Sequence, residues 1–457
     1  MKWLYSILAQ ACLITLILSS QVSPAIQHGL IILTIIANLW LAELLPLSIT
    51  ALLVPVLAVA FNVMDLKAAL LSFAHPIIFL FLGGFALAAA LHEHKLDQYF
   101  AQVIMGKAKN NGLLICLLLF GLTAFLSMWI SNTATTVMML PIALGLMSHL
   151  DYHKHKTVFA FLLLGIAYSA NIGGIATLVG SPPNAIAASA LALSFYDWLV
   201  IALPISLFLL PLMWGILYTL LQPNLNLLNP ASSAESSIQS NLNSSSQPFP
   251  WDYQSILVIV IFIITACLWI LGDLIQNALG DISDFDSWVA ISAIIALHAS
   301  KSLTWVVFEK NTQWGVLILF GGGLALSAVL SQTEANLYLA QQLANLSAGL
   351  GLYLLLLLII LFIIFMTEIS SNTALSALMI PTFMGTADVM GLDQAMIVSA
   401  IAVAASCAFM LPVATPPNAI IFSSGYVPQN TMMKSGLILN LVFSVIITSY
   451  LFLLLST

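Results

Sequence analysis

Apolar residues follow one another in runs of about 20 along most of the chain, and short polar segments separate these runs. A helix of that length crosses the hydrocarbon core of a bilayer, whereas the strands of a membrane barrel are only about ten residues long and alternate in polarity. The pattern therefore predicts an all-α integral membrane protein. We expect eleven spans, at roughly 3–20, 28–45, 47–63, 73–91, 157–193, 198–221, 252–271, 287–300, 314–331, 395–425 and 435–455.

Two further apolar stretches, 112–150 and 350–387, are too long for one span. Each has a polar Ser-Asn-Thr motif near its middle, at Ser131–Thr133 in the first stretch and at Ser371–Thr373 in the second. Backbone polar groups inside a membrane must be satisfied, so such a break must face protein or water. From the pattern alone, each stretch is either two full spans or a re-entrant hairpin.

Three motifs occur twice, in the same order, in the two parts of the chain. Residues 78–87, 125–141 and 180–186 match residues 317–326, 365–381 and 414–420. We count five spans in each half, and an odd number gives the second copy the opposite orientation. The sequence thus predicts an inverted repeat, an architecture typical of secondary transporters. The expected units are a retained extra N-terminal helix at 1–27, a first repeat at 28–222, a polar cytoplasmic linker at 223–251 and a second repeat at 252–457.

Composition supports a lipid environment, because 61% of the residues are hydrophobic and only 6% are charged, against about 25% charged in soluble domains. The chain has no arginine and no cluster of basic residues, which argues against a nucleic-acid partner. The ten lysines indicate the orientation. With the N-terminus in the cytoplasm, only Lys67 falls outside, so we expect a multi-pass protein of the inner (plasma) membrane with a cytoplasmic N-terminus.

The Ser-Asn-Thr motifs have the composition of helix caps. If each is a hairpin tip, the helix that follows directs free N–H groups and a partial positive charge at the middle of the membrane. An anion can bind there without any arginine. One such motif is as easily explained by serine and threonine joining packed helices, but two copies at matched positions favour a binding site.

A second pair of motifs contains consecutive prolines, at Ser181–Asn184 and Thr415–Asn418. Two prolines remove two N–H donors and interrupt a helix, which frees carbonyl groups near Gly180 and Ala414. Free carbonyls suit a hard cation such as sodium, and Asn184 or Asn418 can cap the next helix segment. Glu368, beside the second tip, either binds a cation or proton or holds the hairpin by backbone hydrogen bonds.

Together these motifs resemble the divalent anion/sodium symporter (DASS) family, which includes the bacterial INDY-type dicarboxylate transporters. The resemblance covers nearly the whole chain in motif order and number of spans, and segment 365–374 is especially typical. It implies a homodimer in which each protomer has its own site and moves a transport domain against a scaffold, in an elevator-type mechanism. It also implies re-entrant hairpins at 112–150 and 350–387, joined to the scaffold by amphipathic segments at 96–109 and 335–348.

The resemblance further implies which residues bind the transported species. The substrate ligands would lie at the tips and breaks, at Asn132, Thr133, Ser181, Asn372, Thr373, Thr415 and Pro416. One sodium ion would lie near Ser127, Ser131, Asn132 and Gly180, and a second near Thr367, Ser370, Asn372 and Ala414. The implied function is sodium-coupled symport of a small dianion, a C4-dicarboxylate such as succinate, malate or fumarate.

Several alternatives stay open at this point. Within the family, the protein could exchange one dicarboxylate for another, or carry citrate or sulfate with sodium. A sodium/proton antiporter would need an intramembrane Asp or Lys, and Glu368 is the only acidic residue of that kind. An intramembrane enzyme would need a positioned nucleophile or paired acids, which the sequence does not offer, and a channel fits poorly with inverted repeats and broken helices.

Overall fold

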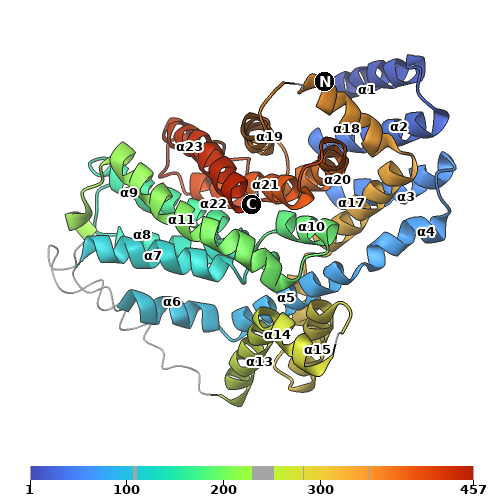
Figure 1. Ribbon diagram of the computed structural model, residues 1–457. Helices are drawn as coiled ribbons and strands as arrows, with labels where there is room; N and C mark the ends of the chain where they lie inside the picture. The colour runs from blue at the N-terminus through green and yellow to red at the C-terminus, as the bar shows by residue number, and fades with distance from the viewer. Residues whose placement is uncertain (1, 107–110, 229–251, 281, 348, 456–457) are drawn as a thin grey trace.

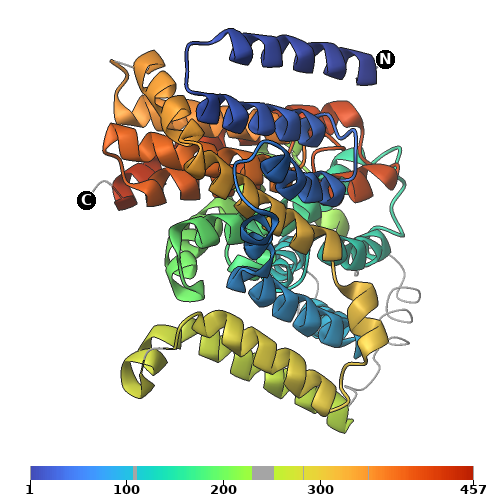
Figure 2. The same cartoon turned by 90° about the vertical axis from the view of Figure 1, so that its right-hand side faces the viewer.

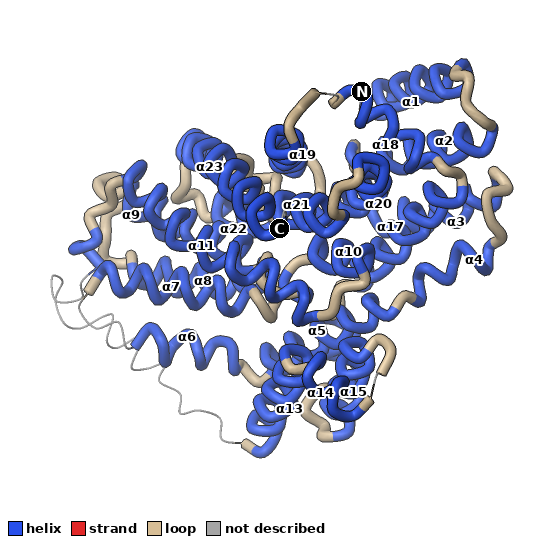
Figure 3. Tube along the Cα trace, viewed as in Figure 1, coloured by secondary structure: helices blue, strands red, loops and turns tan. Residues whose placement is uncertain are grey.

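A computed structural model describes residues 2–106, 111–228, 252–280, 282–347 and 349–455 (Figures 1 and 2). Within these ranges all regular secondary structure is helical and there is no strand (Figure 3), which confirms the predicted all-α fold. Most of the predicted linker, residues 229–251, lies outside the described residues, as do Lys107 and Lys109.

The described helices divide into those before residue 229 and those after residue 252, and that the second group repeats the first stays a prediction. The first part contains α1 (Lys2–Ser19), α2 (Pro24–Leu41), α3 (Leu47–Ala60), α4 (Leu66–Leu71), η1 (Ser72–Ala74), α5 (Pro76–Glu93), α6 (Leu96–Gly106), α7 (Gly112–Ser127), α8 (Asn132–Leu146), α9 (Lys156–Gly173), η2 (Leu178–Gly180), α10 (Pro182–Leu191), α11 (Phe195–Leu221) and η3 (Leu225–Leu228). The second contains α13 (Tyr253–Ile270), α14 (Gly272–Leu279), α15 (Phe285–Ala299), α16 (Trp305–Asn311), α17 (Trp314–Gln332), α18 (Ala335–Leu346), α19 (Leu352–Thr367), α20 (Asn372–Met390), α21 (Gln394–Ala405), α22 (Pro416–Ser423) and α23 (Gln429–Leu455). That the two copies have opposite orientations stays a prediction.

Many helices begin where polar residues and prolines would start them. The Ser23 hydroxyl accepts a hydrogen bond from the backbone of Ile26, and Pro24 occupies the first helical position, where its missing N–H group costs nothing. Ser194 and Asp197 form a reciprocal capping box at the start of α11. Pro182 and Pro416 likewise open α10 and α22, so each proline pair ends one helix segment and begins the next.

Within the described ranges, seven helical segments are long and apolar enough to cross a bilayer, which confirms a membrane-embedded protein. These segments are Pro24–Leu41, Leu66–Glu93, Lys156–Gly173, Phe195–Leu221, Tyr253–Ile270, Trp314–Gln332 and Gln429–Leu454. Other apolar helices are shorter because the chain interrupts them. The predicted spans 157–193 and 395–425, for example, are each divided at a proline pair, so helix length alone does not test the count of eleven.

Each of the two long apolar stretches forms a pair of helices that meet at a Ser-Asn-Thr motif. Helices α7 and α19 have 16 residues each and α8 has 15, which corresponds to about 22–24 Å at 1.5 Å per residue. A hydrocarbon core about 30 Å thick exceeds that length. The fourth helix, α20, has 19 residues and continues to Met390, slightly beyond the predicted boundary, so it is nearly long enough to cross the core. Re-entrant hairpins therefore stay a prediction.

The two halves cross at small residues. A Cβ atom on Gly83 in α5 would lie 2.6 Å from the Cβ of Ala290 in α15. The reciprocal crossing pairs Gly322 in α17 with Ala51 in α3, where an added Cβ would lie 2.4 Å from the alanine Cβ. Small residues allow helix backbones to approach closely in a membrane, where packing rather than water exclusion holds helices together. The centre of the molecule is therefore built from both halves.

Two short helices, α6 and α18, connect these crossing helices to the hairpins. Helix α6 lies between α5 and α7, and α18 lies between α17 and α19. Figure 1 shows α6 and α18 on opposite sides of the molecule. Around the bundle, large apolar side chains are exposed, including Leu207, Phe208 and Ile263, each more than half exposed. Such side chains suit a surface in contact with lipid.

Candidate functional site

The first hairpin tip brings three oxygen atoms together. Ser131 caps α8, because its hydroxyl accepts a hydrogen bond from the backbone N–H of Ala134 at 3.3 Å. The buried Ser127, at the end of α7, places its Oγ 2.5 Å from Asn132 Oδ1 and 2.8 Å from the carbonyl oxygen of Ala170 in α9. The tip thus brings together three predicted ligands, Ser127, Ser131 and Asn132. They lie where the tip contacts α9, the helix before the first break.

The second tip repeats this arrangement. Ser371 accepts a hydrogen bond from the backbone N–H of Ala374 at 3.4 Å and so caps α20. The Thr367 hydroxyl forms a short hydrogen bond with Asn372 Oδ1 and lies 3.1 Å from the carbonyl oxygen of Ala405 in α21. Thr367 is fully buried. The sequence repeat therefore corresponds to a repeated set of contacts.

Each tip places a hydroxyl group between two other oxygen atoms. A hydroxyl has one hydrogen to donate, and at each tip it faces both an amide oxygen and a backbone carbonyl oxygen. Each tip therefore gathers three neutral oxygen atoms around one hydroxyl group. Oxygen clusters of this kind are the ligand type that hard cations prefer. Each tip has the chemistry of a cation site built from neutral oxygens.

Glycine is required beside the first tip. A Cβ on Gly174, directly after α9, would lie 2.4 Å from Asn132 Oδ1. A Cβ on Gly180, a predicted sodium ligand, would lie 2.6 Å from the carbonyl oxygen of Gly174. The loop between α9 and α10 therefore folds back on itself against the tip, and only residues without a side chain permit this close approach.

The asparagine of the first proline pair holds this loop from inside. Asn184 Nδ2 lies 2.8 Å from the carbonyl oxygen of Gly174, 3.1 Å from that of Ile175 and 2.7 Å from that of Thr177. Among the described residues its Oδ1 has no hydrogen-bond partner, although the side chain is fully buried. We expected this asparagine to cap the next helix. Its Nδ2 instead holds the loop carbonyls, and its Oδ1, the atom that would accept from a backbone N–H in a cap, has no partner among the described residues.

Asn418 has the same role in the second half. Its Nδ2 donates to the carbonyl oxygens of Ala408 at 3.0 Å and Leu411 at 3.1 Å, and its Oδ1 also lacks a partner within the described chain. The cap of α22 comes from Thr415, whose hydroxyl accepts from the backbone N–H of Asn418 at 3.2 Å. The expectation that Asn418 is the cap was therefore wrong.

The two broken helices contact each other across the repeat. Asn171 Nδ2, in the first half, donates to Thr415 Oγ1 in the second at 3.2 Å. Ser181, in the first half, lies 3.3 Å from the hydroxyl of Ser406 in the second. Two predicted substrate ligands, Ser181 and Thr415, thus each contact the opposite half. In addition, α22 packs against α8 and α10 packs against α20, so each broken helix contacts the other half's hairpin.

Other predicted ligands lie near these contacts without taking part in them. Thr133 and Thr373, in the first turns of α8 and α20, are half-buried, and neither has a side-chain hydrogen bond within the described residues. Pro416 is exposed at the start of α22. The Ser370 hydroxyl donates to the carbonyl oxygen of Met366 in the preceding turn, so its side chain is directed back to its own helix.

Glu368 binds the loop that follows α21. Its Oε1 accepts hydrogen bonds from the backbone N–H groups of Phe409 at 2.7 Å and Met410 at 2.8 Å, and from the Asn440 side chain at 2.7 Å. Its Oε2 accepts from the backbone N–H of Leu411 at 2.9 Å. The sequence left two roles open for Glu368, binding a cation or proton and holding the backbone. These contacts favour the second role, and the backbone that Glu368 holds belongs to the second break and not to the hairpin.

Sequence reasoning missed several polar residues of this region. Asn171, Ser406 and Asn440 all link elements of the site, and Tyr168 donates from its hydroxyl to the carbonyl oxygen of Phe409 at 2.6 Å. All four side chains are buried. The available signal was a polar residue inside an apolar run, which in a membrane protein usually faces the interior of the bundle.

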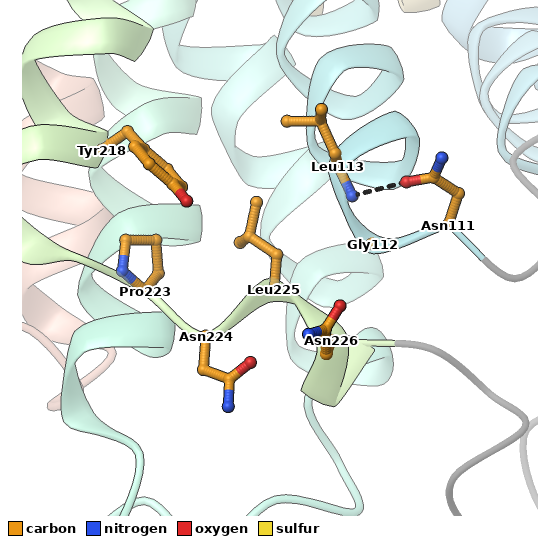
Figure 4. A pocket seen from close by; sticks show the side chains of 8 residues that line it. All are labelled: Asn111, Gly112, Leu113, Tyr218, Pro223, Asn224, Leu225 and Asn226. Atoms are coloured by element: carbon orange, nitrogen blue, oxygen red, sulfur yellow. Dashed lines mark hydrogen bonds between the residues drawn. The ribbon is translucent and has the colours of Figure 1, made fainter.

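A cavity of about 670 Å³ lies away from both tips, between the start of α7 and the end of α11 (Figure 4). The residues that line it are Asn111, Gly112, Leu113, Tyr218, Pro223, Asn224, Leu225 and Asn226. None of them is a predicted ligand. The cavity therefore does not identify the binding site, which is defined by the tips and the breaks.

A membrane protein with two helical hairpins whose tips contact two broken helices belongs to the class of secondary transporters. Comparison with known proteins identifies the family. Residues 32–402 match the family model described as "Citrate transporter", so the chain belongs to this citrate/dicarboxylate transporter family, which confirms the resemblance seen in the sequence.

The relatives are named as transporters. An "Uncharacterized transporter" of Haemophilus influenzae is 48% identical, with 93% of this chain and 91% of the relative covered. The "Sodium-dependent dicarboxylate transporter SdcS" of Staphylococcus saprophyticus is 31% identical, with 92% and 85% covered. Among solved structures, the Neisseria gonorrhoeae MtrF structure matches with a TM-score of 0.57 at 13% identity, covering 86% of this chain and 84% of that one, which shows likeness of fold alone.

Proposed function

We propose that the protein is a sodium-coupled symporter of C4-dicarboxylates. The observation that carries the proposal is the pair of oxygen clusters at the tips, Ser127 with Asn132 and Thr367 with Asn372, each beside a backbone carbonyl. Two neutral oxygen clusters suit two monovalent cations. The relative named as a sodium-dependent dicarboxylate transporter supports the same ion and substrate class.

Charge explains why the cations and the dianion must bind together. Every described lysine from Lys67 onward is exposed, and none contacts the tips or the breaks. Helix N-termini at α8, α20, α10 and α22 each contribute only about half a positive charge, and burying an unneutralised dianion is prohibitively costly. Two bound sodium ions would neutralise the substrate. A third ion, which the family resemblance implies, would make each cycle carry net positive charge inward.

The proposed substrate ligands are Asn132, Thr133, Ser181, Asn372, Thr373, Thr415 and Pro416, which lie at the tips and the breaks. The proposed cation ligands are Ser127, Ser131, Asn132 and Gly180 for one ion, and Thr367, Ser370, Asn372 and Ala414 for the other. In the second set, Ser370 would contribute its backbone carbonyl, since its hydroxyl donates to its own helix.

We further propose that the hairpins and broken helices move as one transport domain against a scaffold, in a homodimer of the inner membrane with its N-termini in the cytoplasm. The contacts of α22 with α8 and of α10 with α20 support a single domain, because they tie each hairpin to the opposite half. The proposed repeats are 28–222 and 252–457, with the hairpins at 112–150 and 350–387 and the linker at 223–251.

The family description makes citrate the second candidate substrate. Uptake of radiolabelled succinate into proteoliposomes, with unlabelled competitors, tests the substrate class. The proposal expects malate and fumarate to compete, and citrate and sulfate to compete weakly. Strong competition by citrate with none by malate would show that the substrate is a tricarboxylate and not a dicarboxylate.

A further inference from the structure

The backbone N–H groups at the start of α22 are either missing or already bonded. Pro416 and Pro417, its first two residues, have no N–H group to donate. The N–H of Asn418 donates to the Thr415 hydroxyl at 3.2 Å, and the N–H of Ala419 donates to the Thr415 carbonyl oxygen at 3.1 Å. A carboxylate that approaches this break must therefore find its hydrogen-bond donor on a side chain.

The hydroxyl group of Thr415 can supply that donor. Its oxygen accepts two hydrogen bonds, one from the backbone N–H of Asn418 and one from Asn171 Nδ2, both at 3.2 Å. A hydroxyl oxygen has two lone pairs and one hydrogen, so the hydrogen must point away from both partners. No described residue accepts a hydrogen bond from it. Thr415 is 2% exposed, and a buried donor without an acceptor costs free energy until an acceptor binds.

Asn171 determines the direction of its bond with Thr415. The amide nitrogen of Asn171 can donate but cannot accept, so the Thr415 oxygen has to accept. Asn171 is 1% exposed and lies in α9, directly after Ala170, whose carbonyl oxygen contacts Ser127 at the first tip. One residue of the first half therefore leaves the Thr415 hydrogen free in the second half before any substrate arrives.

Ser406 has the corresponding place in the second half. It directly follows Ala405, whose carbonyl oxygen contacts Thr367 at the second tip. Ser406 lies 3.3 Å from the hydroxyl of Ser181, which precedes the first proline pair, and either hydroxyl can be the donor. The serine pair therefore leaves the direction of its hydrogen bond open, whereas Asn171 fixes the direction.

We propose that Asn171 is a positioning residue of the substrate site, which holds the Thr415 hydroxyl so that it donates to one carboxylate of the substrate. The inference rests on the proposed function, because the ligand is the dicarboxylate of that site. Asn171 acts through Thr415 and does not itself contact the substrate. The two breaks thus differ, with a fixed donor at the second and a reversible hydroxyl pair at the first.

The main test is a double-mutant cycle at these two positions. Asn171→Leu keeps the branching of the side chain without its amide group, and Thr415→Val replaces the hydroxyl by a methyl group. Asn171→Leu alone should raise the succinate concentration for half-maximal sodium-driven uptake by about tenfold, the effect of one net hydrogen bond. In the Thr415→Val background the same change should alter it less than about twofold, because the hydroxyl that Asn171 orients is gone.

Two more variants keep the cycle decisive. Thr415→Ser retains the hydroxyl, so in that background Asn171→Leu should again raise the succinate requirement by about tenfold. If Asn171→Leu does not fold, as judged by its unfolding temperature, Asn171→Ala replaces it in the same cycle, because a smaller side chain cannot overpack the site. A tenfold effect in the Thr415→Val background would show that Asn171 acts independently of Thr415 and would overturn the inference.

Two further measurements distinguish positioning from general damage to the fold. In Asn171→Leu, the sodium concentration for half-maximal uptake at saturating succinate should change less than about twofold, because the variant removes no cation ligand. Ser406→Ala, the matched change in the second half, should raise the succinate requirement less than about threefold, since Ser181 keeps its own hydrogen. Equal effects of Asn171→Leu and Ser406→Ala on the succinate requirement would contradict a special role of Asn171.

The outcomes separate the inference from the proposed function. If the wild type takes up succinate with sodium and Asn171→Leu leaves the succinate requirement unchanged or lowers it, Asn171 does not hold the Thr415 hydrogen ready for the substrate. The inference then fails and sodium symport survives. If sodium does not drive succinate uptake by the wild type, both the inference and the proposed function are wrong.

Discussion

The two halves of the molecule share one framework and differ in how each is held. In both, a hairpin hydroxyl meets an asparagine oxygen and a backbone carbonyl, and a buried asparagine fixes the loop of the broken helix. In the first half the loop depends on glycine at position 174 and on one threonine hydroxyl. In the second, Ala408 replaces that glycine and the Glu368 side chain accepts hydrogen bonds from three N–H groups of the loop. The two halves therefore hold similar loops in different ways, one by close packing and the other by hydrogen bonds to a buried side chain.

The largest expected effect comes from removing what the halves share. Asn132→Ala and Asn372→Ala should each reduce succinate uptake at least about a hundredfold, because each removes an oxygen that the proposed cation and substrate sites share. Uptake into proteoliposomes measures the loss, with unfolding temperature as the check on folding. Thr382→Ala, on the same helix as Asn372 but away from the tip, is the control and should transport normally. Normal uptake by either asparagine variant would contradict a site shared between the halves.

The next prediction concerns the positions at which the halves differ, Gly174 and Ala408. Gly174→Ala should nearly abolish transport, because its Cβ would lie 2.4 Å from Asn132 Oδ1 and overpacking costs about 1–3 kcal/mol. Ala408→Gly creates no such clash and should reduce uptake only a few fold. Equal effects of the two variants would show that the first half does not depend on close packing at this point.

A smaller effect is expected from the two hairpin hydroxyls. Ser127→Ala and Thr367→Ala should raise the sodium concentration for half-maximal uptake by about tenfold, since each removes one net ligand interaction worth about 1.5 kcal/mol. The succinate concentration for half-maximal uptake, measured at saturating sodium, should change much less. A larger change in the succinate requirement than in the sodium requirement would place these hydroxyls in the substrate site instead.

Much of this comparison was visible in the sequence. Polar triplets such as Ser131–Thr133 inside apolar stretches predicted the tips, and the proline pairs predicted the breaks, because neither pattern fits a continuous membrane helix. The acceptors of Asn184, by contrast, depend on how the loop folds back after Gly174, which no local pattern encodes. The partners of Glu368 lie about 40 residues further along the chain, and Asn440 lies beyond those. Contacts at such distances become visible only in the folded chain.

The test of hairpin orientation changes the protein least, because it only introduces single cysteines. Single cysteines near Gly112 and near Gly351, at the outer ends of α7 and α19, should both leave transport unchanged. A membrane-impermeant thiol reagent should label the first from the cytoplasm and the second from outside, in a background without the four native cysteines. Labelling of both from the same face would rule out the inverted orientation of the two halves.

The most direct test of the account is the sodium dependence of transport itself. Proteoliposomes that contain no internal dicarboxylate are given radiolabelled succinate outside, with either sodium or choline as the external cation. The account predicts that succinate accumulates only with inward-directed sodium, and faster when the interior is made negative. Undiminished uptake in choline would contradict sodium coupling, and uptake that requires internal dicarboxylate would identify an exchanger.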